Sequence, residues 1–382
     1  MTTTKNNEHK KLNVPNLRFP EFQGEWEEYR IEDITVNISS GRCKSHSSNG
    51  KYNLYGSTGI IGKTDEACYE GNLVLVARVG ANAGFLQIIN EPCGITDNTL
   101  IIKPKEVDVQ YIYYFLQHFN LNRLIFGSGQ PLITGGMLKK VKVSLGTIQE
   151  QNKITRLLSV LDERITTQNK IIEDLKKLKS AIIEKVFNGK HSEKLQLNDV
   201  GSYIRGLTYS SNDVVEHGGT LVMRSNNIVN GSLLDYNNNV VFVNKQMSAE
   251  QQLQNGDVVI CMANGSSSLV GKSSFYDGSC HSPITVGAFC GIYRSKKPIV
   301  KWLFQTNKYR RYIWNSLQGG NGAIANLNGE DILNMSFSIP NATIKDTCVK
   351  MLTSVDSALE NNMSLCALYT LQKQHLLRQM FI

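Results

Sequence analysis

Two glycine-rich stretches of this 382-residue chain have the composition of a phosphate-binding loop. They read GSTGIIGKT at 56–64 and GSSSLVGKS at 265–273. A P-loop needs the pattern G-x-x-x-x-G-K-[ST], whose backbone N–H groups surround phosphates in front of a helix. Ser57 and Ser266 stand where the first glycine belongs, and the following residues predict turns and strands. The spacing therefore argues against nucleotide binding and leaves two loops rich in amides and hydroxyls.

Other residue types that perform chemistry also lack the required spacing. No two prolines are adjacent, so the Asn/Asp-Pro-Pro-aromatic loop expected of a base-amino methyltransferase is absent. The seven histidines form no H-E-x-x-H pair, and neither a nucleophile elbow nor a dinucleotide fingerprint occurs. A Ser/His/Asp site stays open, because such triads assemble in space. Cys280 and His281 would point to opposite faces of a strand. We therefore predict no catalytic and no metal-binding residues.

Length and composition indicate a folded protein of two or three domains. Hydrophobic residues make up 41% of the chain and charged residues 19%, which is ordinary for a globular protein. No apolar run approaches the roughly 18 residues that cross a bilayer, and the opening MTTTKNNEHKK lacks the apolar core of a signal peptide. We expect a cytoplasmic protein without a membrane partner, whose eight cysteines are mostly buried, reduced thiols.

The charge of the chain permits an anionic partner such as nucleic acid. The net charge is +8 and the pI is near 8.9. Lysines and arginines are spread along the chain and form no polybasic block. If DNA is bound, we expect a broad surface and not a single basic tail to hold it.

The strongest regularity is a heptad pattern that occurs twice. From residue 154 onward, apolar residues step by alternating four and three positions, as in the a/d seam of a coiled coil. The same steps recur 194 residues later, and both copies are interrupted at the same two places, Gln168/Asn362 and Lys179/Lys373. The predicted seam residues are Ile154, Leu158, Leu161, Ile165, Ile172, Leu175 and Ile182 in the first copy and Leu352, Val355, Leu359, Tyr369 and Leu376 in the second.

One heptad run alone has an ordinary explanation, an amphipathic helix packed on a globular core. Two runs in one register, with matching polar breaks, favour two helices that pack on each other. Polar seam residues lower stability but can fix the register of a specific pair. The first pattern covers about 40 residues, or roughly 60 Å of helix. Such a helix is a spacer and not the core of a domain.

The segments in front of the two helices also repeat. YRIEDITVNISSG at 29–41 resembles LQLNDVGSYIRG at 195–206, and GNLVLVARVGANAG at 71–84 is echoed by GDVVICMANGSSSLVG at 256–271. The second pair has a glycine turn, a short apolar strand and then a polar loop. The chain is therefore predicted to run globular–helix–globular–helix, with short strands and helices mixed in each globular part.

Three passages carry a family resemblance. VPNLRFPEFQGEWEEYRIEDI, PLITGGMLKKVKVSLGTIQEQNKITRLLSVLDERI and LKKLKSAIIEKVF resemble the specificity (S) subunit of type I restriction–modification enzymes. The resemblance covers nearly the whole chain, including its half-repeat. In the second half the chain has IPNATIKDTC where LGTIQEQNKI stands in the first.

The resemblance implies an α+β protein with two mixed α/β target recognition domains in a pseudo-two-fold repeat, separated by an antiparallel coiled coil of two long helices. Each domain would read one half of a bipartite, asymmetric site in double-stranded DNA. The implied partners are two methyltransferase (M) subunits and restriction (R) subunits, and these would carry S-adenosylmethionine, ATP and Mg²⁺. The expected segments are a tail at 1–13, recognition domains at 14–146 and 191–340, and spacer helices at 147–190 and 341–382.

Two other functions remain as alternatives. A fused methyltransferase–specificity enzyme would need a cofactor fold and the Pro-Pro loop in this chain. A coiled-coil DNA-binding adaptor without an enzymatic partner would bind without sequence preference. Methyl transfer by the purified chain would favour the first, and a split consensus from binding-site selection would exclude the second.

If DNA is the ligand, the base contacts should come from the polar loops. Side chains at groove edges read bases, whereas phosphate contacts only position the protein. Arg78 and Arg224 are favoured because each ends an apolar strand beside a polar loop. The candidates in the first domain are Arg42, Lys44, His46, Tyr55, Ser57, Lys63, Arg78, Asn82 and Gln130, and those in the second are Arg205, Tyr209, Arg224, Asn226, Asn264, Ser266, Lys272 and Asn321.

Overall fold

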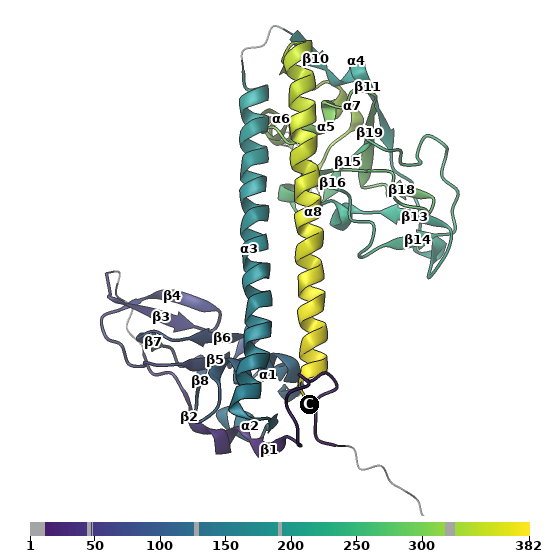
Figure 1. The fold of residues 1–382 in the computed structure, drawn as a ribbon. Coiled ribbons are helices and arrows are strands. Elements are labelled where there is room, and N and C mark those ends of the chain that lie inside the picture. The colour runs from purple at the N-terminus through teal and green to yellow at the C-terminus, as the bar shows by residue number, and fades with distance from the viewer. Residues whose placement is uncertain (1–11, 44–46, 48, 126–129, 190–192, 318–324) are drawn as a thin grey trace, which may run out of the picture. The chain divides into compact units, whose positions relative to one another are not determined.

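The computed structural model forms two compact units (Figure 1). It describes the chain apart from residues 1–11, 44–46, 48, 126–129, 190–192 and 318–324. Unit 1 comprises residues 1–169 and 364–382, and unit 2 comprises residues 170–363. Two long helices, α3 (Ile148–Phe187) and α8 (Ala342–Met380), each contribute one part to each unit.

Unit 1 is built around a four-stranded antiparallel sheet in the order β2-β8-β5-β6. A three-stranded sheet, β4-β3-β7, and a pair, β1-β9, complete its strands. The elements are β1 (Glu27–Arg30), η1 (Ile31–Ile34), β2 (Thr35–Ser40), β3 (Tyr52–Gly56), β4 (Gly59–Thr64), β5 (Leu73–Ala77), η2 (Gly80–Asn82), β6 (Leu86–Ile89), β7 (Cys93–Ile95), β8 (Thr99–Pro104), α1 (Val109–Phe119), η3 (Leu121–Leu124), α2 (Gly135–Lys139) and β9 (Lys142–Leu145).

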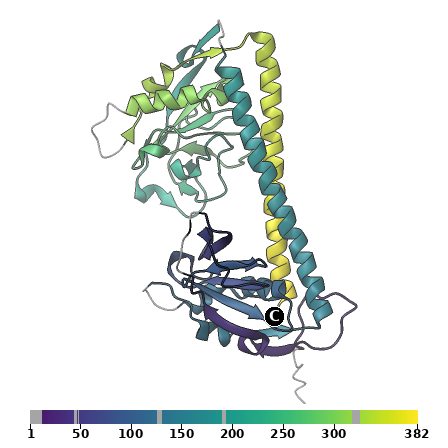
Figure 2. The same cartoon turned by 90° about the vertical axis from the view of Figure 1, so that its left-hand side faces the viewer.

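The core of unit 1 joins the sheet to helix α1 and to both long helices. Every residue of β5 is buried, as expected for a continuous apolar strand with both faces covered. Asp108 precedes helix α1, and its carboxylate accepts a hydrogen bond from the Tyr111 N–H at 2.8 Å and so caps the helix. Leu158 of α3 and Phe381, just after α8, belong to the same hydrophobic cluster as α1. Figure 2 shows α3 in teal and α8 in yellow side by side in this unit.

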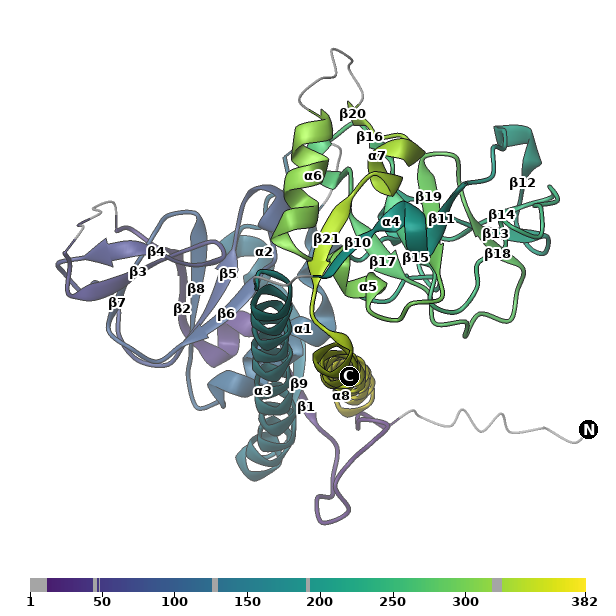
Figure 3. The ribbon, with the colours of Figure 1, turned by 90° about the horizontal axis from the view of Figure 1, so that it is seen from above.

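Unit 2 repeats this arrangement. Its main sheet has the order β11-β19-β15-β17, again antiparallel throughout (Figure 3). The elements are β10 (Glu193–Gln196), α4 (Leu197–Val200), β11 (Gly201–Arg205), η4 (Ser211–Asp213), β12 (Val214–Val215), β13 (Thr220–Met223), η5 (Ser225–Asn227), β14 (Val241–Val243), β15 (Val258–Cys261), β16 (Ala263–Asn264), η6 (Ser267–Leu269), β17 (Ser273–Phe275), β18 (Ile284–Val286), β19 (Cys290–Ser295), α5 (Val300–Leu303), α6 (Asn307–Leu317), β20 (Ala325–Asn326), α7 (Gly329–Leu333) and β21 (Ser336–Ile339).

The two main sheets correspond strand by strand. The strands β2, β8, β5 and β6 stand where β11, β19, β15 and β17 stand in unit 2. The buried strands β5 and β15 are the apolar runs that echo each other in the sequence. The pseudo-two-fold repeat of mixed α/β domains is therefore confirmed in the fold. In unit 2, the core cluster again includes residues of both long helices, Phe187 of α3 and Leu352 of α8 among them.

The predicted seam residues of the two helices lie on the covered faces. Leu158, Leu161 and Leu352 are at most 3% exposed, whereas Ile165, Leu175 and Tyr369 are half-buried. In unit 1, Asp162 contacts Lys373 and Asn169 contacts Cys366. Moving seven residues forward along α3, from Asp162 to Asn169, thus corresponds to moving seven residues backward along α8, from Lys373 to Cys366. The helices are antiparallel, as the resemblance implied.

The two P-loop-like stretches form turns and strands. GSTGIIGKT lies on the hairpin of β3 and β4, and GSSSLVGKS covers η6 and the start of β17. Neither stretch opens an α-helix, so neither has the helix N-terminus that a P-loop uses for phosphate. Among the described helices, none is long and apolar enough to cross a membrane.

Candidate nucleic-acid interface

Arg78 follows the buried strand β5 and has an uncommitted guanidinium nitrogen. Its backbone N–H donates to the Asn98 carbonyl at 3.0 Å, and its carbonyl accepts from the Ile133 N–H at 2.8 Å. The side chain is half-exposed, but Nε is buried and has no hydrogen-bond partner within the described part of the chain. A buried donor without a partner is unfavourable, so the domain itself does not fully satisfy the Arg78 guanidinium.

The tip of the β3–β4 hairpin lies beside Arg78. Ser57 Oγ donates to the Asn98 carbonyl at 3.3 Å, the same carbonyl that accepts from the Arg78 N–H. Gln87 Nε2 donates to the carbonyls of Gly56 and Ser57 at 2.9 and 3.2 Å, which ties the tip to β6. Asn98 and Gln87 were not among the predicted site residues. They gather Ser57 and Arg78 into one polar surface.

Two other predicted residues of this hairpin are engaged within the domain. Tyr55 Oη donates to Glu91 at 2.6 Å, and Lys63 Nζ donates to Asn53 Oδ1 at 2.7 Å. Burial and the Glu91 carboxylate raise the pKa of Tyr55 to about 12, so its hydroxyl stays protonated at neutral pH. These side chains support the hairpin. Of the remaining candidates, Arg42, Asn82 and Gln130 are exposed, and Lys44 and His46 lie outside the described residues.

In unit 2, a loop after β13 presents Arg224 and Asn226 to solvent. The fully buried Asn227 orders this loop: its Oδ1 accepts from the Arg224 N–H, and its Nδ2 donates to the carbonyls of Asp235 and Asn238. Arg224 Nη2 donates to the Asn239 carbonyl at 3.1 Å, so part of the guanidinium is held in place. The sequence did not point to Asn227, because the residues around it in the sequence do not distinguish a buried asparagine from the exposed Asn226 beside it.

A second polar loop of unit 2 joins the first. Asn264 Nδ2 donates to Ser225 Oγ at 3.2 Å, and Asn264 Oδ1 accepts from the Ser266 N–H at 2.9 Å. The structure therefore brings the predicted residues Arg224, Asn226, Asn264 and Ser266 together. Elsewhere, Arg205 is exposed on β11, Tyr209 and Lys272 are half-buried, and Asn321 lies outside the described residues.

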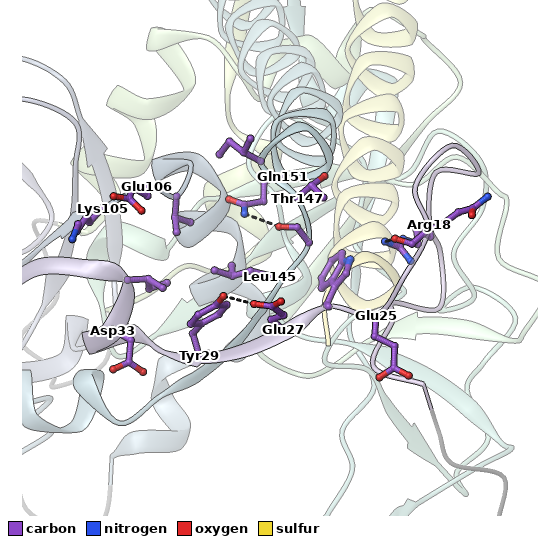
Figure 4. Close-up of a pocket in the computed structure, with 16 residues that line it drawn as sticks. Arg18, Glu25, Glu27, Tyr29, Asp33, Lys105, Glu106, Leu145, Thr147 and Gln151 are labelled. Atoms are coloured by element: carbon purple, nitrogen blue, oxygen red, sulfur yellow. Dashed lines mark hydrogen bonds between the residues drawn. The ribbon is translucent and has the colours of Figure 1, made fainter.

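A cavity of about 440 Å³ lies beside the start of α3 in unit 1 (Figure 4). Its lining includes four carboxylates, those of Glu25, Glu27, Asp33 and Glu106. Lys105 and Arg18 also line it, but Arg18 is bound to the buried Glu150, with 2.7 Å between Nε and Oε1. An excess of carboxylates repels phosphate. The lining of this cavity is therefore unsuited to DNA.

Each unit contains a polar junction where three elements meet on one aspartate. The first junction consists of Asp162, Lys373 and Tyr114: Lys373 Nζ lies 2.6 Å from Oδ1, and Tyr114 Oη donates to Oδ2 at 2.8 Å. The second contains Asp356, Lys179, Lys301 and Trp302: Lys179 Nζ lies 2.6 Å from Oδ1 and Lys301 Nζ 3.2 Å from Oδ2, and Trp302 Nε1 donates to Oδ2 at 3.1 Å. In both, an aromatic donor from the globular domain binds the carboxylate that pairs the helices.

The two junctions are related by the sequence repeat. Moving 17 residues from Asp162 to Lys179 along α3 corresponds to moving 17 residues back from Lys373 to Asp356 along α8. The heptad pattern indicated the matched lysines as polar breaks but did not reveal their partners. The aspartates lie one position beyond the seam residues Leu161 and Val355, where the pattern alone indicates a solvated face.

Two copies of one α+β domain, each built on parts of the same two antiparallel helices, define a protein with an internal duplication. The chain belongs to the family described as type I restriction modification DNA specificity domain, whose model matches residues 23–177 and 190–365. The two matches coincide with the two repeats of the sequence.

Individual proteins support this assignment. The chain is 34% identical over 158 residues to the EcoKI specificity subunit of Escherichia coli K12, and 30% identical over 188 residues to the MjaVIII specificity subunit of Methanocaldococcus jannaschii. These alignments cover 39% and 45% of this chain but only 31% and 43% of the relatives' own lengths. A crystal structure of a type I restriction–modification S subunit from M. genitalium shares the fold, with a TM-score of 0.68, 16% identity and coverage of 97% of this chain and 99% of the other.

Proposed function

We propose that this chain is the non-catalytic DNA specificity subunit of a type I restriction–modification complex. Each domain reads one half of a bipartite, asymmetric target in double-stranded DNA. The observation that carries the proposal is the duplicated family match, which assigns one DNA specificity domain to each repeat. The net charge of +8 and the polar loops around Arg78 and Arg224 support a polyanionic ligand.

The chemistry of the complex would then belong to partner subunits. Two quasi-equivalent domains suit two methyltransferase subunits, one per domain, and restriction subunits would complete the assembly. S-adenosylmethionine, ATP and Mg²⁺ would be bound by these partners. Within the described residues, no group of three or more His, Cys, Asp or Glu side chains could hold a metal ion.

The test is binding-site selection from random double-stranded DNA with the purified chain, alone and with its methyltransferase partner. We expect a split consensus whose halves differ, separated by several unread base pairs. A pool without consensus would favour the adaptor without sequence preference. Methyl transfer by the chain without partners would favour the fused enzyme.

Replacing Arg78 with alanine should relax recognition within one half-site. An arginine that contacts a base edge contributes about 1–3 kcal/mol of discrimination, which corresponds to a roughly 5- to 150-fold loss at one position. Arg30→Ala is the matched control, because Arg30 is an exposed arginine of the same unit whose recorded ion pair is with Glu32. Competition binding against single-base variants of the selected target measures the effect. Unchanged affinity and unchanged choice at every base would remove Arg78 from the interface.

Lengthening the spacer should widen the gap between half-sites. We would insert one heptad between Asp162 and Lys179 and one between Asp356 and Lys373, so that both polar junctions stay intact. Seven residues add about 10.5 Å of helix, or about three base pairs of B-DNA, if the spacer follows the DNA axis. Binding-site selection should return a longer gap and the same two half-sites. A changed half-site would contradict the spacer role, and a heptad in α3 alone is the control that should prevent pairing.

A further inference from the structure

Two cysteines of unit 1 are in direct contact although they are 25 residues apart in sequence. Their Sγ atoms lie 2.8 Å from each other. Cys43 follows β2 and is buried, whereas Cys68 lies in the turn region after β4 and is exposed. The pair therefore combines a fixed inner sulfur with an outer sulfur that small molecules can reach. Neither thiol has a role in the proposed reading of DNA.

The backbone holds both cysteines against the same strand, β7. The Cys43 N–H donates to the Ile95 carbonyl at 3.0 Å. Tyr69, next to Cys68, exchanges two hydrogen bonds with Cys93, at 2.9 and 3.0 Å. Cys43 is thus attached at one end of β7 and Cys68 at the other. Because each segment is hydrogen-bonded to a common strand, the approach of the sulfurs is built into the fold.

A glycine between these attachment points leaves the space that the inner sulfur needs. A Cβ added at Gly94 would lie 3.0 Å from Cys43 Sγ and 2.9 Å from side-chain atoms of Leu54 and Thr64. Such distances are too short for ordinary packing, so a larger residue here would displace the sulfur. The packing around β7 therefore accommodates the thiol pair.

The other cysteines show what distinguishes this pair. Cys261 and Cys290 of unit 2 face each other on neighbouring strands, but both are buried. Cys93 is fully buried, so small molecules in solution do not reach its sulfur. Only Cys43 and Cys68 offer a sulfur–sulfur contact with one exposed member among the described residues.

We propose that Cys43 and Cys68 form a reversible intramolecular disulfide on exposure to a peroxide. Cys68 sulfur attacks one oxygen of hydrogen peroxide, the O–O bond breaks, and a sulfenic acid and one water result. Cys43 sulfur then attacks Cys68 sulfur, forms the S–S bond and displaces the second water. Two thiol protons leave with the two waters, and the two electrons reduce the peroxide. A dithiol reductant reverses the reaction.

The disulfide would close a loop that contains the β3–β4 hairpin, with Tyr55, Ser57 and Lys63. A cross-link restricts the conformations of the segment it encloses. If the proposed function is correct, oxidation should change recognition of the half-site read by unit 1 and leave the other half-site unchanged. This consequence rests on the proposed function, whereas the disulfide itself does not.

The pH dependence of the reaction follows from the outer thiol. Its hydrogen bond with Cys43 and its burial raise the pKa of Cys68 to about 11, so at neutral pH it is almost entirely protonated. Because the thiolate is the nucleophile, oxidation should be slow near pH 7 and accelerate about tenfold per pH unit until the pH approaches that pKa.

The test is peptide mapping of the full chain after treatment with hydrogen peroxide and alkylation of the remaining thiols. We expect a linked pair of peptides carrying Cys43 and Cys68, lighter by two hydrogens than the reduced pair and separated by dithiothreitol. Cys43→Ser and Cys68→Ser should each abolish the linked species. Cys280→Ser, which removes a half-exposed cysteine of unit 2, should leave it unchanged.

Two results would overturn the inference at different levels. Recovery of Cys68 only as a sulfenic or sulfinic acid, or in an intermolecular disulfide, would exclude the Cys43–Cys68 link. A complete link with the same affinity for every half-site variant before and after oxidation would exclude its effect on recognition. Peptide mapping requires no DNA, so failure of the proposed DNA-binding function would not be mistaken for failure of the disulfide.

Discussion

Deletion of residues 342–382 is expected to make the remaining chain aggregate or dimerise, and a half-chain that ends near Gly189 is expected to pair with its own copy. Without α8, the buried face of α3 around Leu158, Leu161 and Ile172 would be exposed to water. Each such side chain loses about 1.5–3 kcal/mol of burial free energy. A chain that ends near Gly189 should therefore dimerise or aggregate instead of remaining a stable monomer.

The polar junctions predict the geometry of that dimer. In the full chain, Asp162 faces Lys373 and Lys179 faces Asp356, and the repeat makes Lys373 equivalent to Lys179 and Asp356 equivalent to Asp162. Two antiparallel copies of α3 can therefore place Asp162 of each copy opposite Lys179 of the other. The dimer should read a palindromic target made of two copies of the first half-site.

Analytical ultracentrifugation and binding-site selection on the chain that ends near Gly189 test both statements. The matched control is the same truncation with Lys179→Glu, which places two carboxylates opposite each other at both junctions and should weaken the dimer. A monodisperse monomer that still selects the full asymmetric target would refute the paired-helix arrangement.

Replacement of Asp356 by alanine should strongly destabilise the protein. The change leaves Lys179 Nζ without its carboxylate at a site where the lysine side chain is only 7% exposed, and it leaves Trp302 Nε1 without its acceptor. Removing one member of a buried ion pair destabilises a protein by about 3–5 kcal/mol. Denaturant unfolding of the full chain measures the change in free energy.

Two further variants separate the ion pair from other effects. Asp174→Ala removes an exposed carboxylate of α3, the helix that carries Lys179, and should change stability by no more than about 0.5 kcal/mol, because Asp174 pairs only with the exposed Lys177 at 3.7 Å among the described residues. The double variant Lys179→Met/Asp356→Leu should recover the part of the loss that comes from the unpaired Lys179, while Trp302 Nε1 stays without its acceptor. Burial lowers the pKa of Lys179 in spite of Asp356, so apolar packing can replace the pair. A loss below about 1 kcal/mol for Asp356→Ala would show that water reaches the junction.

The helices and the repeat could be predicted because their signals are periodic. Apolar residues at heptad spacing indicated the covered faces of α3 and α8, and the buried strands β5 and β15 appeared as matching apolar runs. From the sequence, each helix was predicted to follow one domain as a separate segment. In the structure each helix is divided between the units, because antiparallel pairing returns the end of α8 to unit 1.

The candidate interface was less predictable because its contacts are not local. Arg78 and Ser57 could be suspected from their loops, but Asn98, which joins them, lies on a different connection. The hydrogen bond from Tyr55 to Glu91 likewise depends on the pairing of β3 with β7, because Glu91 lies just before β7. Arg18 and Trp26 lie in a passage that resembles the family. Both donate to the carboxylate of the buried Glu150, which is more than a hundred residues away in the sequence. The spacing of residues along a chain does not predict such long-range contacts.

The repeat makes Asp162 equivalent to Asp356 and Lys179 equivalent to Lys373, and this equivalence of the two polar junctions has an evolutionary consequence. If one gene once encoded a self-pairing half, a single codon change at its aspartate would have altered both junctions at once. In the present chain Asp162 and Asp356 mutate separately, so one junction can drift while the other keeps the helices in register. Duplication thus lets each half change in sequence without a simultaneous change in its twin.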